Sequence, residues 1–219
     1  MIKRNIFVFI LFFISGLLFA QSITVNEYRN RIMHYFENKN NNIIFDTVEL
    51  YNAGFTVDDP SDFDTNLVFF FYGIKNDNIE RYNYFYNYVR QSKNQRLINI
   101  FEYIERYGLD GFFINPAINP SLNDVYWTLY FSSGNVKYLD KIIEIAEKHK
   151  ASNDLMLYLS ARSGMWSLKL NIQTYNSILN HFRNIKNDEL KNYILLNTVE
   201  DITNETIEHI KAQREKGIW

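Results

Sequence analysis

Apolar residues recur along most of the chain at intervals of three and four positions. This is the period of amphipathic helices, whereas half-buried strands alternate at every second position. Only 3 Pro and 8 Gly interrupt the 219 residues, so the sequence favours helices joined by short polar turns. Three helices of the first half are marked by the stripes Tyr28, Ile32, Tyr35 and Phe36, then Tyr82, Phe85, Tyr86 and Val89, then Leu97, Ile100, Phe101 and Ile104.

Two further helices are expected between the first and second of these stripes. One should begin near Asp46, and the next should follow Asp64 and Thr65 into the apolar run "NLVFFFYGI". Asp64 is expected to cap this helix, because an acid suits the positive end of a helix dipole. Gly108 is expected to end the helix that precedes it by adopting the left-handed conformation.

Residues 119–149, "NPSLNDVYWTLYFSSGNVKYLDKIIEIAEKH", predict a hairpin of two helices. Ser121 is the expected N-cap, with Asp124 three residues later where a capping box places an acid. Gly134 should end this helix, and Asn135 should cap the next one. Such a short connection favours an antiparallel pair.

Four more helices are expected at about 154–169, 174–184, 188–199 and 203–216, which gives about nine in all. No fixed repeat period and no named repeat signature is present. The predicted fold is therefore an all-α domain of stacked antiparallel helical hairpins, as either an irregular bundle or a short α-solenoid.

The first twenty residues have the pattern of a secretory signal peptide. Lys3 and Arg4 precede an apolar stretch at 6–19, and Ala20 provides a small residue for cleavage. That stretch is shorter than the roughly 20 residues that span a bilayer. We therefore expect a signal peptide at 1–20, a single helical domain at 21–219, a periplasmic or secreted location, and no stable membrane insertion after cleavage.

Composition narrows the classes of function. The formal net charge is −2, and loss of the two cations of the leader makes it more negative, which argues against a nucleic-acid or anionic-lipid partner. The chain has no Cys, so disulfides and a Cys nucleophile are excluded. Its 16 Tyr and 18 Phe accompany many Asn, Ile and Lys, as an AT-rich genome would produce, so aromatic abundance alone is no sign of a binding face.

Two segments of the second half, "NDVYWTLYFSSGNVKYLDKII" and "SARSGMWSLKLN", resemble paired motifs of uncharacterised all-helical proteins that bacteria export. The matching positions are Trp127, Phe131, Ser132, Ser133, Gly134, Asn135 and Tyr138, then Ala161, Trp166, Ser167 and Leu168. The resemblance implies a shared helical fold and brings no activity with it.

Four residues are candidates for a binding or packing site: Trp127, Tyr130, Arg162 and Trp166. In one interpretation the two Trp are buried wedges at helix–helix junctions. In the other, the four residues line a groove for a ligand or a partner segment. Arg162 keeps the groove interpretation open, because this residue falls in an apolar row of its helix, where an unpaired charge is costly. It could also cap the turn at 132–135.

The sequence contains no recognisable catalytic or metal-binding motif. Four acids crowd "DDPSDFDTN", but Leu67 and Gly73 stand where an EF-hand loop needs Gly and Glu. The 4 His are scattered without zinc-ligand spacing, and no nucleophile or phosphate-binding motif occurs, so no cofactor is expected. We expect an exported interaction or structural module with a protein or peptide partner. The alternative is a cell-envelope hydrolase with acidic residues converging from separate helices, because such acids leave no trace in sequence.

Overall fold

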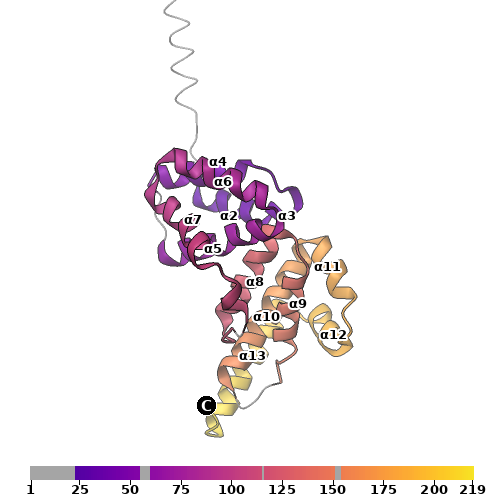
Figure 1. The fold of residues 1–219 in the computed structure, drawn as a ribbon. Coiled ribbons are helices and arrows are strands. Elements are labelled where there is room, and N and C mark those ends of the chain that lie inside the picture. Colours follow the sequence, from indigo (N-terminus) through magenta and orange to yellow (C-terminus); the bar gives the residue numbers. More distant parts are fainter. Residues whose placement is uncertain (1–22, 55–59, 115, 151–153) are drawn as a thin grey trace, which may run out of the picture.

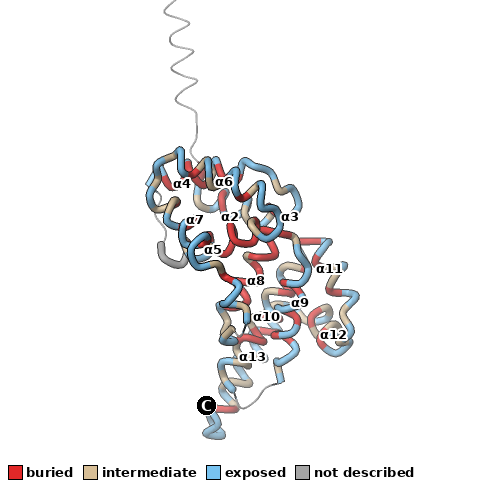
Figure 2. Tube along the Cα trace, in the orientation of Figure 1, coloured by how far each residue is buried: buried red, intermediate tan, exposed pale blue. Residues whose placement is uncertain are grey.

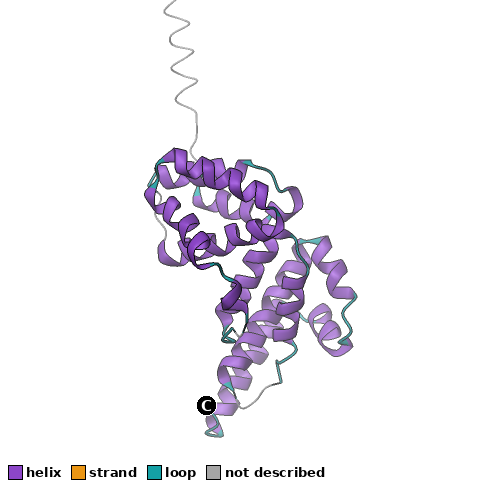
Figure 3. Cartoon of the chain, viewed as in Figure 1, coloured by secondary structure: helices purple, strands orange, loops and turns teal. Residues whose placement is uncertain are grey.

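The computed structural model describes residues 23–54, 60–114, 116–150 and 154–219. Within these ranges the chain forms twelve α-helices and one short 3-10 helix, with no strand (Figure 1 and Figure 3). The all-α prediction is confirmed, and the arrangement is a bundle of packed helices. The predicted signal peptide at 1–20 lies outside the described residues, and the single domain at 21–219 stays a prediction.

The first half contains six α-helices and the 3-10 helix. The six α-helices gather at one end of the molecule (Figure 1). Asn78 and Asn94 each accept a backbone N–H at the start of a helix, as good N-caps do. The elements are α2 (Val25–Met33), α3 (Tyr35–Asn38), α4 (Asn42–Asn52), α5 (Pro60–Asp77), α6 (Ile79–Ser92), α7 (Gln95–Tyr107) and η1 (Asp110–Phe113).

The second half contains six α-helices. Figure 1 shows α8, α9, α10 and α13 side by side, with α11 and α12 on their flank. Their bounds are α8 (Pro120–Ser133), α9 (Lys137–Ala146), α10 (Leu155–Thr174), α11 (Asn176–Arg183), α12 (Asp188–Leu196) and α13 (Val199–Glu215).

Helix α8 is the centre of the fold. It packs against α2, α3, α5, α9 and α10, and ten of its 14 residues are buried. Figure 2 shows buried positions where α8 meets its neighbours. A helix that is buried nearly all round lacks a polar stripe, which explains its unusual run of aromatic residues. Buried apolar side chains form one continuous cluster from Ile23 to Ile202, so α8 joins the two halves through a shared core.

Helices α5 and α8 approach each other closely at Gly73. A Cβ at this position would lie 1.9 Å from Ser132 Oγ and 3.0 Å from Ser132 Cβ. Real Cβ atoms do not come this close to other heavy atoms, so any side chain at position 73 would force Ser132 or its helix to shift. The sequence pattern did not indicate this contact, because it depends on two helices about sixty residues apart in the chain.

Several predicted helix starts are wrong. Asp64 lies inside α5, where its carboxylate accepts a hydrogen bond from Tyr51 and pairs with Arg96, so it does not cap that helix. The helix expected near Asp46 begins at Asn42, and the first stripe is divided between two helices, α2 and α3. The acidic stretch that contains Asp64 lies partly outside the described residues.

The predicted hairpin at 119–149 is present with a different cap. Asn119 accepts the Leu122 N–H, and Pro120 is the first helical residue, so Ser121 is not the N-cap. Proline suits this position because its missing N–H would have no partner there. Gly134 ends the helix in the left-handed conformation with φ of 69°, as expected.

The turn between α8 and α9 is held by its own side chains. Ser133 Oγ accepts the Asn135 N–H at 3.1 Å, and Asn135 Oδ1 accepts the Lys137 N–H at 3.1 Å. The N-cap of α9 is Val136 and not Asn135 as predicted, although the Asn135 side chain does accept the first helical N–H. Arg162 binds elsewhere and does not cap this turn.

Candidate binding groove and the buried arginine

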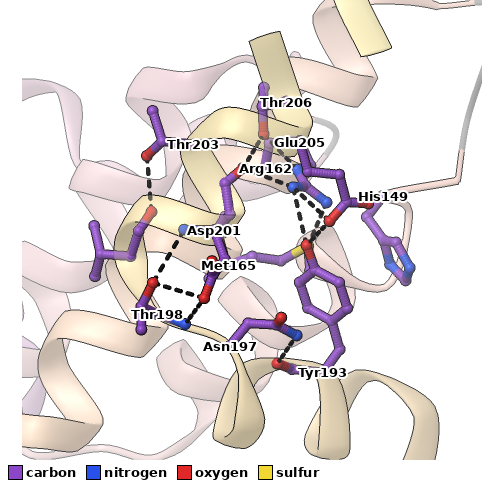
Figure 4. Close-up of polar contacts among 12 residues, drawn as sticks. His149, Arg162, Met165, Tyr193, Asn197, Thr198, Asp201, Thr203, Glu205 and Thr206 are labelled. Carbon is purple, nitrogen blue, oxygen red and sulfur yellow. Dashed lines mark hydrogen bonds and ion pairs between the residues drawn. The ribbon is translucent and has the colours of Figure 1, made fainter. Parts of the chain in front are cut away.

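Arg162 on α10 is 4% exposed and fully engaged with the protein itself. Its Nε donates to Thr206 Oγ1 at 2.6 Å, and its Nη2 donates to the Ile202 carbonyl at 2.7 Å and to the Tyr193 hydroxyl at 3.2 Å (Figure 4). The Glu205 carboxylate lies 3.5 Å from Nη2 and balances the charge. Arg162 thus ties α10 to α12 and α13, and it does not face a ligand.

His149 extends this cluster on one side. Its ring lies beside that of Tyr193 (Figure 4) and stacks on it with 6.3 Å between centroids. Nδ1 of His149 lies 3.1 Å from the Ala146 carbonyl. A carbonyl only accepts, so Nδ1 carries the proton. Burial, with the nearby positive charge of Arg162 in addition, lowers the pKa of His149 below its ordinary value.

Lys169 is the second buried cation of α10, at 8% exposed. Its Nζ donates to the carbonyls of Ile194 at 3.0 Å and Leu195 at 3.2 Å, which belong to the last turn of α12. Terminal carbonyls of a helix have no partner within the helix and carry its negative dipole end, so a lysine is well placed there. Both cations of α10 therefore point inward and bind neighbouring helices.

Trp127 is buried at 6% exposed, as the packing interpretation expected. Its ring stacks on Phe131 at 5.5 Å and meets Tyr130 edge-on at 6.2 Å, while Nε1 donates to Ser167 Oγ on α10 at 2.9 Å. Trp127 and Tyr130, two of the four candidates, are therefore in contact. This cluster continues to Phe36, whose ring lies 4.9 Å from that of Tyr130.

Trp166 is 44% exposed, so the expectation that both Trp are buried is wrong for this one. It belongs to the row of α10 residues that faces solvent and lies one residue before Ser167. In the part of the chain that the structure describes, no hydrogen bond or ring contact joins Trp166 or Arg162 to Trp127. The four candidates consequently do not form one site.

A groove of about 520 Å³ lies on the other side of Trp127, between α2, α5 and α8. We call it the Trp127 groove. Most of its lining is apolar, from Ile32, Met33, Phe63, Leu67, Phe70, Trp127 and Phe131. Met33 is exposed at its edge, while Trp127, Leu67 and Phe70 form buried walls.

Two charged residues line the same groove, Arg29 on α2 and Asp124 on α8. Neither has an ion pair or a side-chain hydrogen bond within the described ranges. Asp124 is exposed and lines the groove next to Trp127 and Thr128, and partial burial of its carboxyl raises its pKa above the ordinary value. The groove thus combines an apolar floor with one unpaired charge of each sign.

The sequence pattern pointed to Trp127 but not to Arg29, Met33 or Asp124 as its neighbours. Met33 was the one groove residue that the sequence could have indicated, because it is large and apolar yet lies outside the buried stripe of α2. The register of α2 against α8 decides that these residues meet, and this register is a tertiary property.

A second groove of about 750 Å³ runs between α5, α7 and η1. Tyr103, Tyr107 and Phe112 are exposed along it. Its charged residues, Asp64 and Arg96, bind each other at 2.7 Å. Because its charges are already paired, this groove offers a ligand less specific recognition than the Trp127 groove does.

A third hollow of about 290 Å³, between α9 and α11, is lined by acids. The three carboxylates come from α9 or the residue after it, and not from separate helices. Each has a partner, namely His181 for Asp140, Lys141 for Glu144 and Asn187 for Glu147. This hollow gives no support to the hydrolase alternative, which stays a prediction.

Two structural findings bear on partners. Within residues 23–54, 60–114, 116–150 and 154–219, no group of three or more His, Asp or Glu is arranged to hold a metal ion. No helix in the same part of the chain is both long enough and apolar enough to cross a bilayer.

Comparisons of the chain with protein-family models, with curated proteins and with solved structures found no significant match. The resemblance of the two aromatic motifs to exported helical proteins therefore stays a prediction.

Proposed function

We propose that the protein is an exported, non-enzymatic interaction module, and that its Trp127 groove binds a short segment of a partner protein. The observation that carries this proposal is the position of Asp124. Asp124 is part of a mostly apolar lining and has no side-chain partner among the described residues, and partial desolvation disfavours its charged form. A partner that supplies a cation there would remove this cost.

The lining defines the chemistry of the segment. Apolar side chains would pack on Met33 and Trp127, and each one fully buried contributes about 1.5–3 kcal/mol. A Lys or Arg of the partner would pair with Asp124, and an acid or a C-terminal carboxylate with Arg29. Three helices form the walls, so the groove is held open by the fold and needs little rearrangement to bind.

The experiment is a selection from a random peptide library on wild-type protein, followed by affinity measurement. Met33→Glu places a charge in the groove, so it should weaken the selected peptides at least tenfold. Ile79→Glu is the matched control, because Ile79 is exposed at the first residue of α6, where an acid suits the helix. Peptides that bind Met33→Glu as tightly as wild type, or the absence of any enriched peptide, would contradict the proposal.

The pH dependence of binding supplies a second test. A partner cation favours ionised Asp124, so affinity should rise as pH increases through the raised pKa of this residue. Asp124→Asn removes the titrating group and should abolish that rise. If the pH profile is the same in both proteins, Asp124 does not contact the segment.

A further inference from the structure

Helix α10 has an inverted distribution of charge. On a helix at the surface, charged residues normally face solvent and apolar residues face the core. The two cations of α10, Arg162 and Lys169, are both buried, whereas Met156, Trp166 and Leu170 are exposed. The contacts of Arg162 and Lys169 with α12 and α13 explain the inward charges, but nothing within the described chain accounts for the outward apolar residues.

The outward positions of α10 repeat at three and four residues. This is the spacing of a seam that packs against another helix, as in coiled coils. None of these residues is charged, and none is fully buried. We call them the α10 seam; they are Met156, Leu159, Ser163, Trp166, Leu170 and Gln173.

We propose that the α10 seam binds the α10 seam of a second copy of this chain, with the two helices antiparallel. The intervals of the seam are 3, 4, 3, 4 and 3, which read the same in both directions. A two-fold axis between Ser163 and Trp166 therefore places every seam residue opposite a seam residue, as an isologous interface requires.

The side chains are complementary in this arrangement. The large indole of Trp166 lies opposite Ser163 of the partner subunit, so a large residue meets a small one on both sides of the axis. Leu159 lies opposite Leu170 of the partner subunit, and Met156 opposite Gln173 of the partner subunit. Because the seam carries no charge, its contact with itself involves no like-charge repulsion, which otherwise disfavours self-association.

The α10 seam is distinct from the Trp127 groove, which α2, α5 and α8 form. The two surfaces can therefore be tested separately. Met33→Glu should leave dimerisation unchanged, and Trp166→Glu should leave peptide binding to the groove unchanged.

Sedimentation equilibrium of the purified protein over a range of concentrations tests the dimer. Wild type should reach twice the monomer mass, and Trp166→Glu and Leu170→Glu should each weaken the dimer at least tenfold while keeping the helical circular dichroism of wild type. Ile79→Glu, the same change at an exposed residue of α6, should dimerise normally. A monomer at about 100 µM, a hundredfold above a micromolar Kd, would overturn the proposal. A dimer that survives both charged variants would also overturn it.

Cross-linking tests the orientation, and the absence of native Cys makes the result unambiguous. Leu159→Cys and Leu170→Cys are oxidised separately and as a mixture. In the antiparallel seam only the mixture forms the disulfide, because residue 159 of one copy meets residue 170 of the other. Each copy carries a single Cys, so every disulfide that forms joins two copies. Disulfides in each single variant and none between the two would show a parallel pair and would overturn the arrangement.

Discussion

The indole of Trp127 on α8 donates a hydrogen bond to Ser167 Oγ on α10, with 2.9 Å between Nε1 and Oγ. Ser167 donates its own hydroxyl proton to the Gly164 carbonyl at 3.0 Å, which leaves its oxygen lone pairs free to accept from the indole. A buried Trp needs such a partner for its N–H, so the contact fixes both the orientation of the ring and the register of the two helices.

The first prediction contrasts the two Trp. Trp127→Ala leaves a cavity in the core and should lower the free energy of unfolding by about 3–5 kcal/mol. Trp166→Ala should cost clearly less, on the order of 1 kcal/mol, because 44% of this residue is exposed in the monomer and no buried cavity is left. Urea unfolding at low protein concentration measures both without a contribution from self-association. Equal losses in the two variants would show that Trp166 is buried in the folded monomer.

The second prediction concerns the contact of Gly73 with Ser132. A methyl group at position 73 would overlap Ser132 Oγ, which is itself held by a hydrogen bond to the Leu129 carbonyl. Gly73→Ala should therefore destabilise the protein by about 1–3 kcal/mol. At a helix position with no neighbour in the way, the same change would be stabilising, because alanine has the higher helix propensity.

Ser132→Gly removes the overlapping atoms and serves as the test of this cause. The double variant should be more stable than the sum of the two single changes predicts, since the residues are in contact. Strictly additive effects in thermal unfolding would show that α5 and α8 do not approach each other here.

The third prediction concerns the ion pair of Arg162 and Glu205, whose two side chains differ in burial. Arg162 is buried, whereas the Glu205 side chain is 56% exposed. Arg162→Met removes the shared donor of three protein acceptors and should cost about 3–5 kcal/mol. Glu205→Gln should cost about 1 kcal/mol or less, because the arginine keeps its other contacts and the exposed carboxylate is screened by water. Comparable losses would show that the ion pair dominates the cluster.

Much of the helical architecture followed from apolar spacing, because stripes such as Leu97, Ile100, Phe101 and Ile104 are local and buried as expected. Helix starts were harder, since Asn119 and Ser121 are both good caps, and the local signal for Asn119 was Pro120, which suits the first helical position. Trp166 was wrongly expected to be buried, because nothing in α10 itself tells on which side of the core-facing row this residue falls. That choice depends on the carbonyls of α12 and α13 that its cations bind.

The fourth prediction concerns export. If residues 1–20 are a cleaved signal peptide, N-terminal sequencing of the protein recovered outside the cytoplasm should begin near Gln21. Replacing Lys3 and Arg4 by acids should reduce export, because the positive n-region would be lost. An uncleaved chain that begins at Met1 and stays with the membrane would show that the apolar stretch is an anchor.

The last prediction follows from the burial of His149. Its pKa is lowered from 6.5, so the folded protein resists protonation at this residue more than the unfolded chain does. Between the lowered pKa and 6.5 the unfolded chain binds more protons, and stability therefore rises with pH across this range. As pH falls below about 6.5, the free energy of unfolding should decrease until the lowered pKa is passed, after which this contribution is constant.

His149→Asn keeps an N–H that can reach the Ala146 carbonyl but does not titrate, so its stability should depend less on pH in that range. Urea unfolding of both proteins between pH 5.5 and pH 8, above the ordinary range of carboxylates, measures the difference in slope. Identical slopes would show that His149 is protonated as readily in the folded protein as in the unfolded chain.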